Sequence, residues 1–187
     1  FGHTGFLVTE GGIDNTLRSY FGLQQVHARY AQSLVREIRY ADERGQLLDT
    51  TAAVASGAYR RSQIATRYEN GVEVFVNGHA TQNWVTPQAT LPPFGWYARD
   101  AVKGDLLAFS ALYEGKRADY VDSPAYLYAD PRGALVRFNQ LTCDGPLVAI
   151  RNAASSMEAI PVAGCTHFGL ATGDPADFSS PVATSTG

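Results

Sequence analysis

A period-two alternation of apolar and polar residues in the middle of the chain constrains the fold more than any other feature. The alternation runs through residues 67–85 and is interrupted at Asn70-Gly71 and again at Asn77-Gly78. Asn-Gly favours the left-handed backbone of tight hairpin turns, so alternating segments around it predict antiparallel strands with one buried face. We therefore expect a hairpin at each Asn-Gly pair.

Further turn signals recur about every 8–12 residues, which is typical of a sandwich or barrel of short strands. We find no internal sequence repeat, which argues against a propeller. The sequence predicts a mainly β fold, with an antiparallel β-sandwich over residues 35–172. The expected strands are 35–40, 62–68, 72–76, 80–85, 95–99, 105–113, 118–121, 135–141, 147–151 and 158–162.

One strand-loop-helix unit, residues 1–34, precedes this sandwich. Residues 1–8 are predicted to form a short strand, and a Gly-containing loop leads to a helix capped by Asp14, Asn15 or Thr16. The helical pattern rests on apolar residues at Leu17, Tyr20, Phe21, Val26, Tyr30 and Leu34.

Such a unit cannot cover its own apolar surface, so we expect it to be the last unit of a (β/α)8 barrel. The face built from Leu17, Phe21 and Tyr30 would then lack its partner, and the isolated helix would be poorly stable. Residues 173–187 are rich in Gly, Pro, Ser and Thr and are expected to form a flexible tail or linker.

Composition excludes some functions. The chain has 187 residues, of which 45% are hydrophobic and 18% charged, and this suits a packed fold. A net charge of −3 lacks the basic excess of a nucleic-acid-binding protein, so no nucleic-acid partner is expected. No apolar run approaches the ~20 residues that span a bilayer, and no signal peptide remains. Because the chain starts at Phe1 and its one methionine is Met157, we expect a processed product, an excised domain or a fragment.

A family resemblance covers roughly residues 1–140 and lies in the order of several short segments. These are FGHTGFL, LQQVHARY, YENGVEVFVNG, LPPFGWYA, GDLLAFSAL and DYVDSPAYLYAD. Their order resembles the C-terminal part of large bacterial glycoside hydrolases of the α-N-acetylgalactosaminidase-like group, which have a TIM-barrel catalytic domain followed by a β-sandwich. The resemblance implies a secreted, cell-surface or periplasmic protein whose partners are a carbohydrate and the N-terminal catalytic domain of the same protein. Because the catalytic carboxylates of such enzymes come from earlier barrel strands, it also implies that this chain has no complete active site.

Glycoside hydrolysis requires a pair of carboxyl groups. Glu10 and Asp14 flank the first loop and could approach a sugar, but Asp14 also suits a helix cap and Glu10 also suits solvent. His3 could hydrogen-bond a sugar hydroxyl or serve a structural role. Five acidic residues at hairpin ends or on strand faces are expected in water: Glu69, Glu73, Glu114, Asp119 and Asp122.

Trp84 and Trp96 are candidate substrate-binding residues because aromatic rings stack on sugars, although aromatic side chains also fill sandwich cores. An accessory part of a hydrolase therefore has two alternatives: a carbohydrate-binding module without catalysis, and a purely structural sandwich. The four histidines lack metal-ligand spacing, and we expect no metal or other cofactor. Cys143 and Cys165 either form a disulfide or remain two buried thiols.

Overall fold

The computed structural model describes residues 12–152, 156–162 and 164–170. The predicted strand at residues 1–8, His3, Glu10 and the tail 173–187 lie outside the described residues. The described part is mainly β, and every strand pairing in it is antiparallel. The prediction of an antiparallel, mainly β fold is therefore confirmed.

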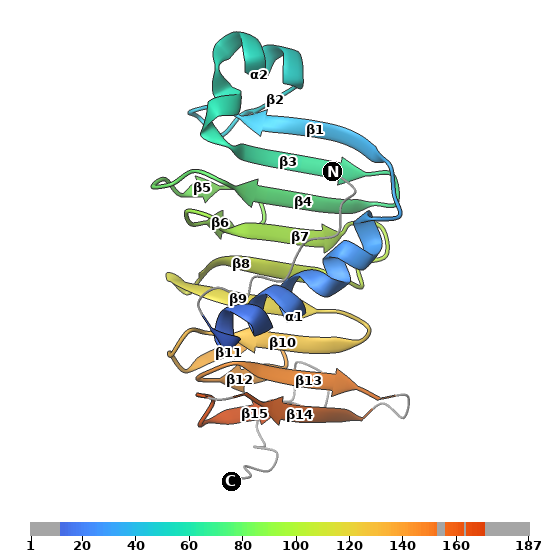
Figure 1. The fold of residues 1–187 in the computed structure, drawn as a ribbon, viewed down its shortest axis with the longest axis vertical. Coiled ribbons are helices and arrows are strands. Elements are labelled where there is room, and N and C mark those ends of the chain that lie inside the picture. The colour runs from blue at the N-terminus through green and yellow to red at the C-terminus, as the bar shows by residue number, and fades with distance from the viewer. Residues whose placement is uncertain (1–11, 153–155, 163, 171–187) are drawn as a thin grey trace.

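A long twisted sheet forms the body of the molecule, and its strands follow the order β14-β13-β10-β9-β8-β7-β4-β3-β1-β2 (Figure 1). These strands are β1 (Val35–Ala41), β2 (Leu47–Leu48), β3 (Gln63–Tyr68), β4 (Val72–Asn77), β7 (Trp96–Asp100), β8 (Leu107–Tyr113), β9 (Lys116–Asp122), β10 (Tyr126–Asp130), β13 (Leu147–Arg151) and β14 (Met157–Pro161). The hairpin of β5 (Trp84–Val85) and β6 (Thr90–Leu91) joins the sheet at β8.

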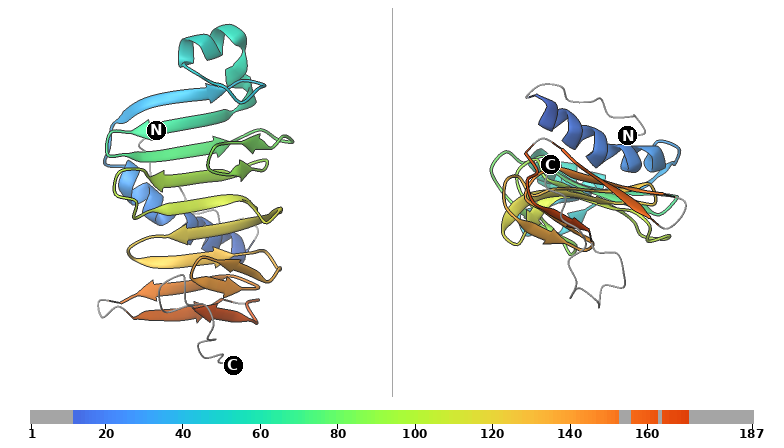
Figure 2. Two further views of the ribbon diagram at one scale, coloured as in Figure 1. Left: turned by 180° about the vertical axis from the view of Figure 1, so that it is seen from behind. Right: turned by 90° about the horizontal axis from the view of Figure 1, so that it is seen from below.

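A second, smaller sheet has the order β11-β12-β15, built from β11 (Val136–Phe138), β12 (Leu141–Cys143) and β15 (Phe168–Leu170). The segment 135–141, predicted as one strand, is thus β11 followed by a turn into β12. Helix α1 (Ile13–Tyr30) lies diagonally across one face of the large sheet, and the small sheet lies on the opposite face (Figures 1 and 2). The short helices α2 (Thr50–Ser56) and η1 (Ala58–Arg61) follow β2 at one end of the sheet.

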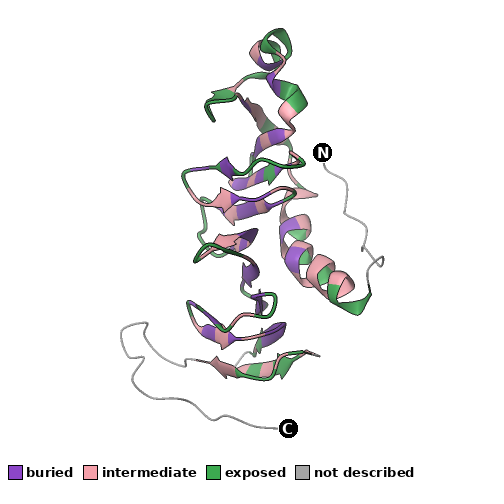
Figure 3. Ribbon diagram, turned by 90° about the vertical axis from the view of Figure 1, so that its left-hand side faces the viewer, coloured by how far each residue is buried: buried purple, intermediate pink, exposed green. Residues whose placement is uncertain are grey.

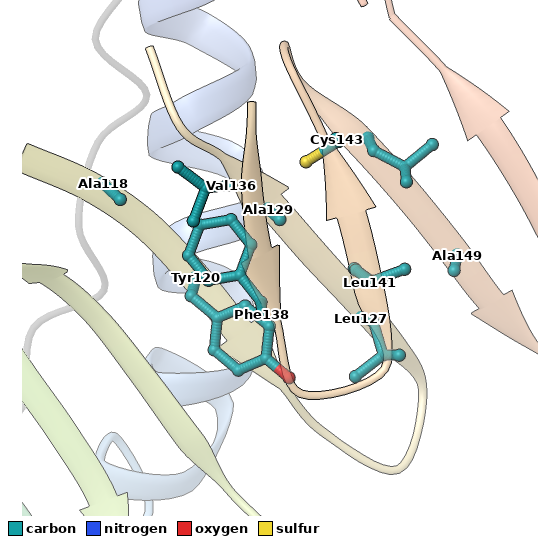
Figure 4. Packing of buried hydrophobic residues seen from close by; sticks show 10 residues of the cluster. Ala118, Tyr120, Leu127, Ala129, Val136, Phe138, Leu141, Cys143 and Ala149 are labelled. Atoms are coloured by element: carbon teal, nitrogen blue, oxygen red, sulfur yellow. The ribbon is translucent and has the colours of Figure 1, made fainter. Parts of the chain in front are cut away.

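The face opposite α1 holds most of the core. Tyr120, Leu127 and Leu147 of the large sheet pack against Phe138 and Leu141 of the small sheet, and all five are at most 3% exposed. The rings of Tyr120 and Phe138 stack with centroids 5.2 Å apart (Figure 4). This two-sheet packing is the sandwich that the alternation predicted.

Helix α1 is held by this same chain, and the expectation that its apolar side lacks a partner is wrong. Val26 is only 2% exposed, and Phe21 and Tyr30 pack against the same cluster of sheet residues. The ring of Tyr30 stacks on that of Tyr68 in β3, with centroids 5.2 Å apart. The apolar face of α1 therefore covers the middle of the large sheet.

The start of α1 also differs from the prediction. The N-cap is Gly12, and no side chain of a described residue caps the helix there; Asp14, Asn15 and Thr16 all lie inside the helix. The Thr16 hydroxyl instead donates to the carbonyl of Gly12. Leu34 lies beyond the end of the helix and is 71% exposed.

The two Asn-Gly pairs have different roles. Asn70-Gly71 forms the predicted hairpin between β3 and β4, with Gly71 at φ 91°. Asn77-Gly78 ends β4 without making a hairpin, because β4 pairs next with β7 and the chain first makes an excursion through β5 and β6. Asn77 is fully buried, and its amide donates to the carbonyls of Gln82, Leu91 and Pro92, so it fastens this excursion to the sheet.

Candidate functional site

Two carboxylates, Asp119 and Asp130, lie side by side on the helix-bearing face of the large sheet. They are direct cross-strand partners in β9 and β10, and their side chains are 9% and 1% exposed. The expectation that Asp119 lies in water is wrong, and the same holds for Glu73, which is 8% exposed and ion-paired to Arg67 and Arg99. The strand pattern correctly placed these acids on sheet faces, but it did not show which faces are covered.

Arginine side chains neutralise both carboxylates. Arg18 Nε of α1 lies 2.5 Å from Asp130 Oδ2 and 3.9 Å from Asp119 Oδ2. Arg132 Nε lies 2.8 Å from Asp119 Oδ2. The backbone of Arg132 is in the left-handed region, with φ 54°. Burial opposes the charge of Arg18, but the hydrogen bond from Arg18 to Asp130 and the nearby negative charges outweigh it and raise the pKa of Arg18.

A third guanidinium borders this pair. Arg117 donates to the hydroxyl of Ser110 and to the carbonyls of Pro93 and Phe94. Burial, together with the positive charge of Arg132, lowers the pKa of Arg117. The surroundings of Asp119 and Asp130 are thus rich in positive charge.

The hydroxyl of Tyr128 lies close to the same charges. Tyr128 is fully buried, and its hydroxyl has no hydrogen-bond partner among the described residues. Burial raises the pKa of Tyr128, and the negative charges of Asp130 and Asp119 raise it further. Tyr128 is therefore a neutral phenol.

This arrangement suits a structural lock better than acid-base chemistry. A glycosidase requires one carboxyl group that gives up a proton and another that reaches the sugar or a water molecule. Here Asp119 and Asp130 both accept hydrogen bonds from arginines, and Arg18 of α1 lies over them. The cluster ties the first half of α1 to β9 and β10.

The structure separates the two predicted substrate-binding tryptophans. Trp84 is 4% exposed and packs with Phe75 and Leu91 on the face opposite α1. Trp96 is half-buried on the helix face, where a Cβ added to Gly22 would lie 3.4 Å from its ring. That both residues bind substrate stays a prediction; in this conformation Trp84 fills the core, and Trp96 supports α1.

A partly exposed apolar strip adjoins the helix on the same face of the large sheet. Tyr40, Ile64 and Val76 are consecutive cross-strand neighbours in β1, β3 and β4, and Val76 pairs next with Trp96. We call these three residues the open apolar row. Val76 is 41% exposed, and Tyr40 and Ile64 are half-buried.

The outward side of α1 continues this apolar character. Ile13 is 64% exposed and Tyr20 is 41% exposed, and they are seven residues apart, which places them on the same side of the helix. Exposed residues gather at the start of α1, on the side away from the sheet (Figure 3). The helix-bearing side therefore presents apolar groups to its surroundings from both the sheet and the helix.

Within the described ranges, no group of three or more His, Cys, Asp or Glu side chains could hold a metal ion. No helix in the described part of the chain has the length and apolar character to cross a membrane.

Comparisons with known proteins identify no relative: no family model, no curated protein and no solved structure matches this chain.

Proposed function

We propose that this chain is the C-terminal accessory portion of a secreted or cell-surface glycoside hydrolase, without a complete active site of its own. In this proposal the catalytic acid and base belong to an N-terminal catalytic domain of the same protein. The sandwich docks against that domain through its helix-bearing face and stabilises it. The basis for the enzyme class is the resemblance of residues 1–140 to the C-terminal part of such hydrolases.

The chemistry of the described residues supports an accessory role. The carboxylate pair Asp119 and Asp130 is neutralised by Arg18 and Arg132, so neither acid is available to protonate a leaving group or to attack a sugar. The buried position of Trp84 also removes one of the two rings that a sugar-binding surface would use. A stabilising role fits these features better than catalysis or glycan capture.

The observation that carries the proposal is the open apolar row. Tyr40, Ile64 and Val76 form a continuous line across three strands beside α1, in which Val76 is 41% exposed and Tyr40 and Ile64 are half-buried. Apolar side chains that gather on one face are typical of interaction sites, and on this face Val76, Ile13 and Tyr20 are the exposed ones. A catalytic domain that covers the row would bury these side chains together with Ile13 and Tyr20.

The test uses the parent enzyme and one matched pair of substitutions. Val76→Asp places a charge in the open apolar row, whereas Val85→Asp makes the same change at a 73% exposed residue on the β5–β6 hairpin. We expect Val76→Asp to lower the Tm of the parent enzyme by roughly 5 °C more than Val85→Asp does, because burial of an unpaired charge is costly. The Val76→Asp variant of the parent enzyme should also lose its glycoside hydrolysis at a lower temperature than the Val85→Asp variant does.

Two results would contradict the proposal. Equal effects of Val76→Asp and Val85→Asp would show that the row is not an interface. If the parent protein has no glycosidase activity on a panel of aryl glycosides, the assignment to glycoside hydrolases is contradicted, even if the open apolar row is an interface.

A further inference from the structure

The two cysteines of the chain belong to one hydrophobic cluster. Cys143, the last residue of β12, is fully buried, and its sulfur lies among the side chains that join the two sheets (Figure 4). Cys165 is half-buried and packs against the same cluster from the segment before β15. Both are free thiols in the structure.

The backbone segments that carry the two cysteines are clamped together. The carboxylate of Asp144, next to Cys143, accepts hydrogen bonds from the backbone N–H groups of Thr166 at 2.8 Å and His167 at 3.0 Å. The N–H of Asp144 donates in turn to the carbonyl of His167 at 3.1 Å. These hydrogen bonds hold the pKa of Asp144 well below its usual range.

Gly145 shows how closely the segments approach. A Cβ added to Gly145 would lie 2.8 Å from the Cα of Cys165 and 2.6 Å from the carbonyl oxygen of Gly164. On the other side, Cys143 is the cross-strand partner of Phe168. The chain around Cys165 therefore contacts the chain around Cys143 on both sides, at Gly145 and at the β12–β15 pairing.

We propose that Cys143 and Cys165 are a redox modification site, at which a small-molecule disulfide such as oxidised glutathione converts the two thiols into an intramolecular disulfide. The thiolate of Cys165, the more exposed of the two, attacks one sulfur of the small disulfide and expels one small thiolate, which takes up the proton that Cys165 has lost. The thiolate of Cys143 then attacks Sγ of Cys165 and expels the second small thiolate, which takes up the proton from Cys143. Two protein thiols are oxidised, and one small disulfide is reduced to two small thiols.

The order of the two steps follows from burial. Burial raises the pKa of both thiols, and Cys143 is the more deeply buried. Cys165 therefore meets the reagent first, and Cys143 acts in the second step. The bond closes a loop over residues 143–165, which contains β13 and β14, and joins β12 directly to the segment that enters β15.

The experiment maps the bond in the whole chain. The protein is incubated with oxidised glutathione or with a reductant, denatured, treated with an alkylating reagent and digested with trypsin. Cleavage after Arg137 and Arg151 places Cys143 in peptide 138–151 and Cys165 in the peptide that begins at Asn152. We expect these two peptides to be cross-linked after oxidation and separate after reduction, and the Tm to rise by roughly 5–10 °C on oxidation.

The single variants Cys143→Ser and Cys165→Ser serve as matched controls, since each should lose both the cross-link and the redox dependence of the Tm. Recovery of both cysteines in alkylated form after oxidation would overturn the proposal. This measurement uses the wild-type chain, so it does not depend on whether a variant folds. A mixture of chains labelled with ¹⁴N and ¹⁵N distinguishes a bond within one chain from a bond between chains. Cross-links that join light and heavy peptides would also overturn it.

Discussion

The ring of Phe21 in α1 stacks on the ring of Tyr128 in β10, with centroids 5.4 Å apart and planes 20° apart. The hydroxyl of Tyr126 reaches the backbone of the same residue and donates to the Phe21 carbonyl at 2.6 Å. These contacts join residues more than one hundred positions apart in the chain. They make α1 a covering layer of the large sheet.

Removal of the Phe21 ring should therefore loosen the helix. We expect Phe21→Ala to lower the free energy of unfolding by about 3 kcal/mol, because it leaves a gap over Tyr126 and Tyr128. Ile13→Ala, at a 64% exposed position of the same helix, should cost less than about 1 kcal/mol. Urea unfolding measures both, and hydrogen exchange should show faster exchange in α1 of Phe21→Ala. Equal costs for the two variants would contradict the packing that we describe.

The lock between Arg18 and Asp130 gives a second prediction. Asp130→Asn removes the carboxylate closest to the guanidinium of Arg18, and Asp130 is a buried residue. We expect this change to lower the free energy of unfolding by about 3 kcal/mol. Asp105→Asn removes a partner of Arg29, but Asp105 has a 40% exposed side chain, and Arg29 keeps Asp100. That control should cost less than about 1 kcal/mol. In urea unfolding, a loss at Asp130 no greater than that at Asp105 would show that the lock does not hold the helix.

Asn77 should be essential to the excursion between β4 and β7. Asn77→Ala leaves the carbonyls of Leu91 and Pro92 without their buried donor, and we expect a cost of about 3 kcal/mol. Asn70→Ala, at the true hairpin, breaks hydrogen bonds that are partly solvent-accessible and should cost about 1 kcal/mol. Hydrogen exchange would locate the Asn77 effect in residues 82–92, and an effect confined to β3 would argue against this role.

His27 predicts the pH dependence of helix docking. Burial lowers the pKa of His27 below its ordinary value of 6.5. Because the unfolded chain then binds a proton more readily than the folded chain does, stability is lost as the pH falls below about 6.5 and levels off below the folded pKa. We expect the Tm of the wild type to decrease more than that of His27→Gln between pH 7.5 and pH 5.0. Parallel decreases for the two proteins would assign the effect to other groups.

The sequence by itself determined several of the longer strands, among them β4, β8 and β13, and the hairpin at Asn70-Gly71. It did so because side-chain alternation and turn preference act over a few residues, and a segment such as Val72–Asn77 carries the whole signal. The same local signal was wrong at Asn77-Gly78. There the Asn77 amide donates to the carbonyls of Leu91 and Pro92, and Trp84 and Leu91 pack in the core; these contacts lie beyond the range of any turn rule.

Only the tertiary structure decided what covers each face. Alternation shows that Tyr120 and Val121 point in opposite directions, but it does not say that one meets Phe138 of the small sheet and the other lies on the helix face. For the same reason the helical pattern reveals the apolar side of α1 without identifying its partner, and the strand pattern does not show that Arg18 and Arg132 pair with Asp119. Local pattern fixes the direction of a side chain, whereas burial and ion pairing arise between segments far apart in the chain, whose approach depends on the packing of the whole fold.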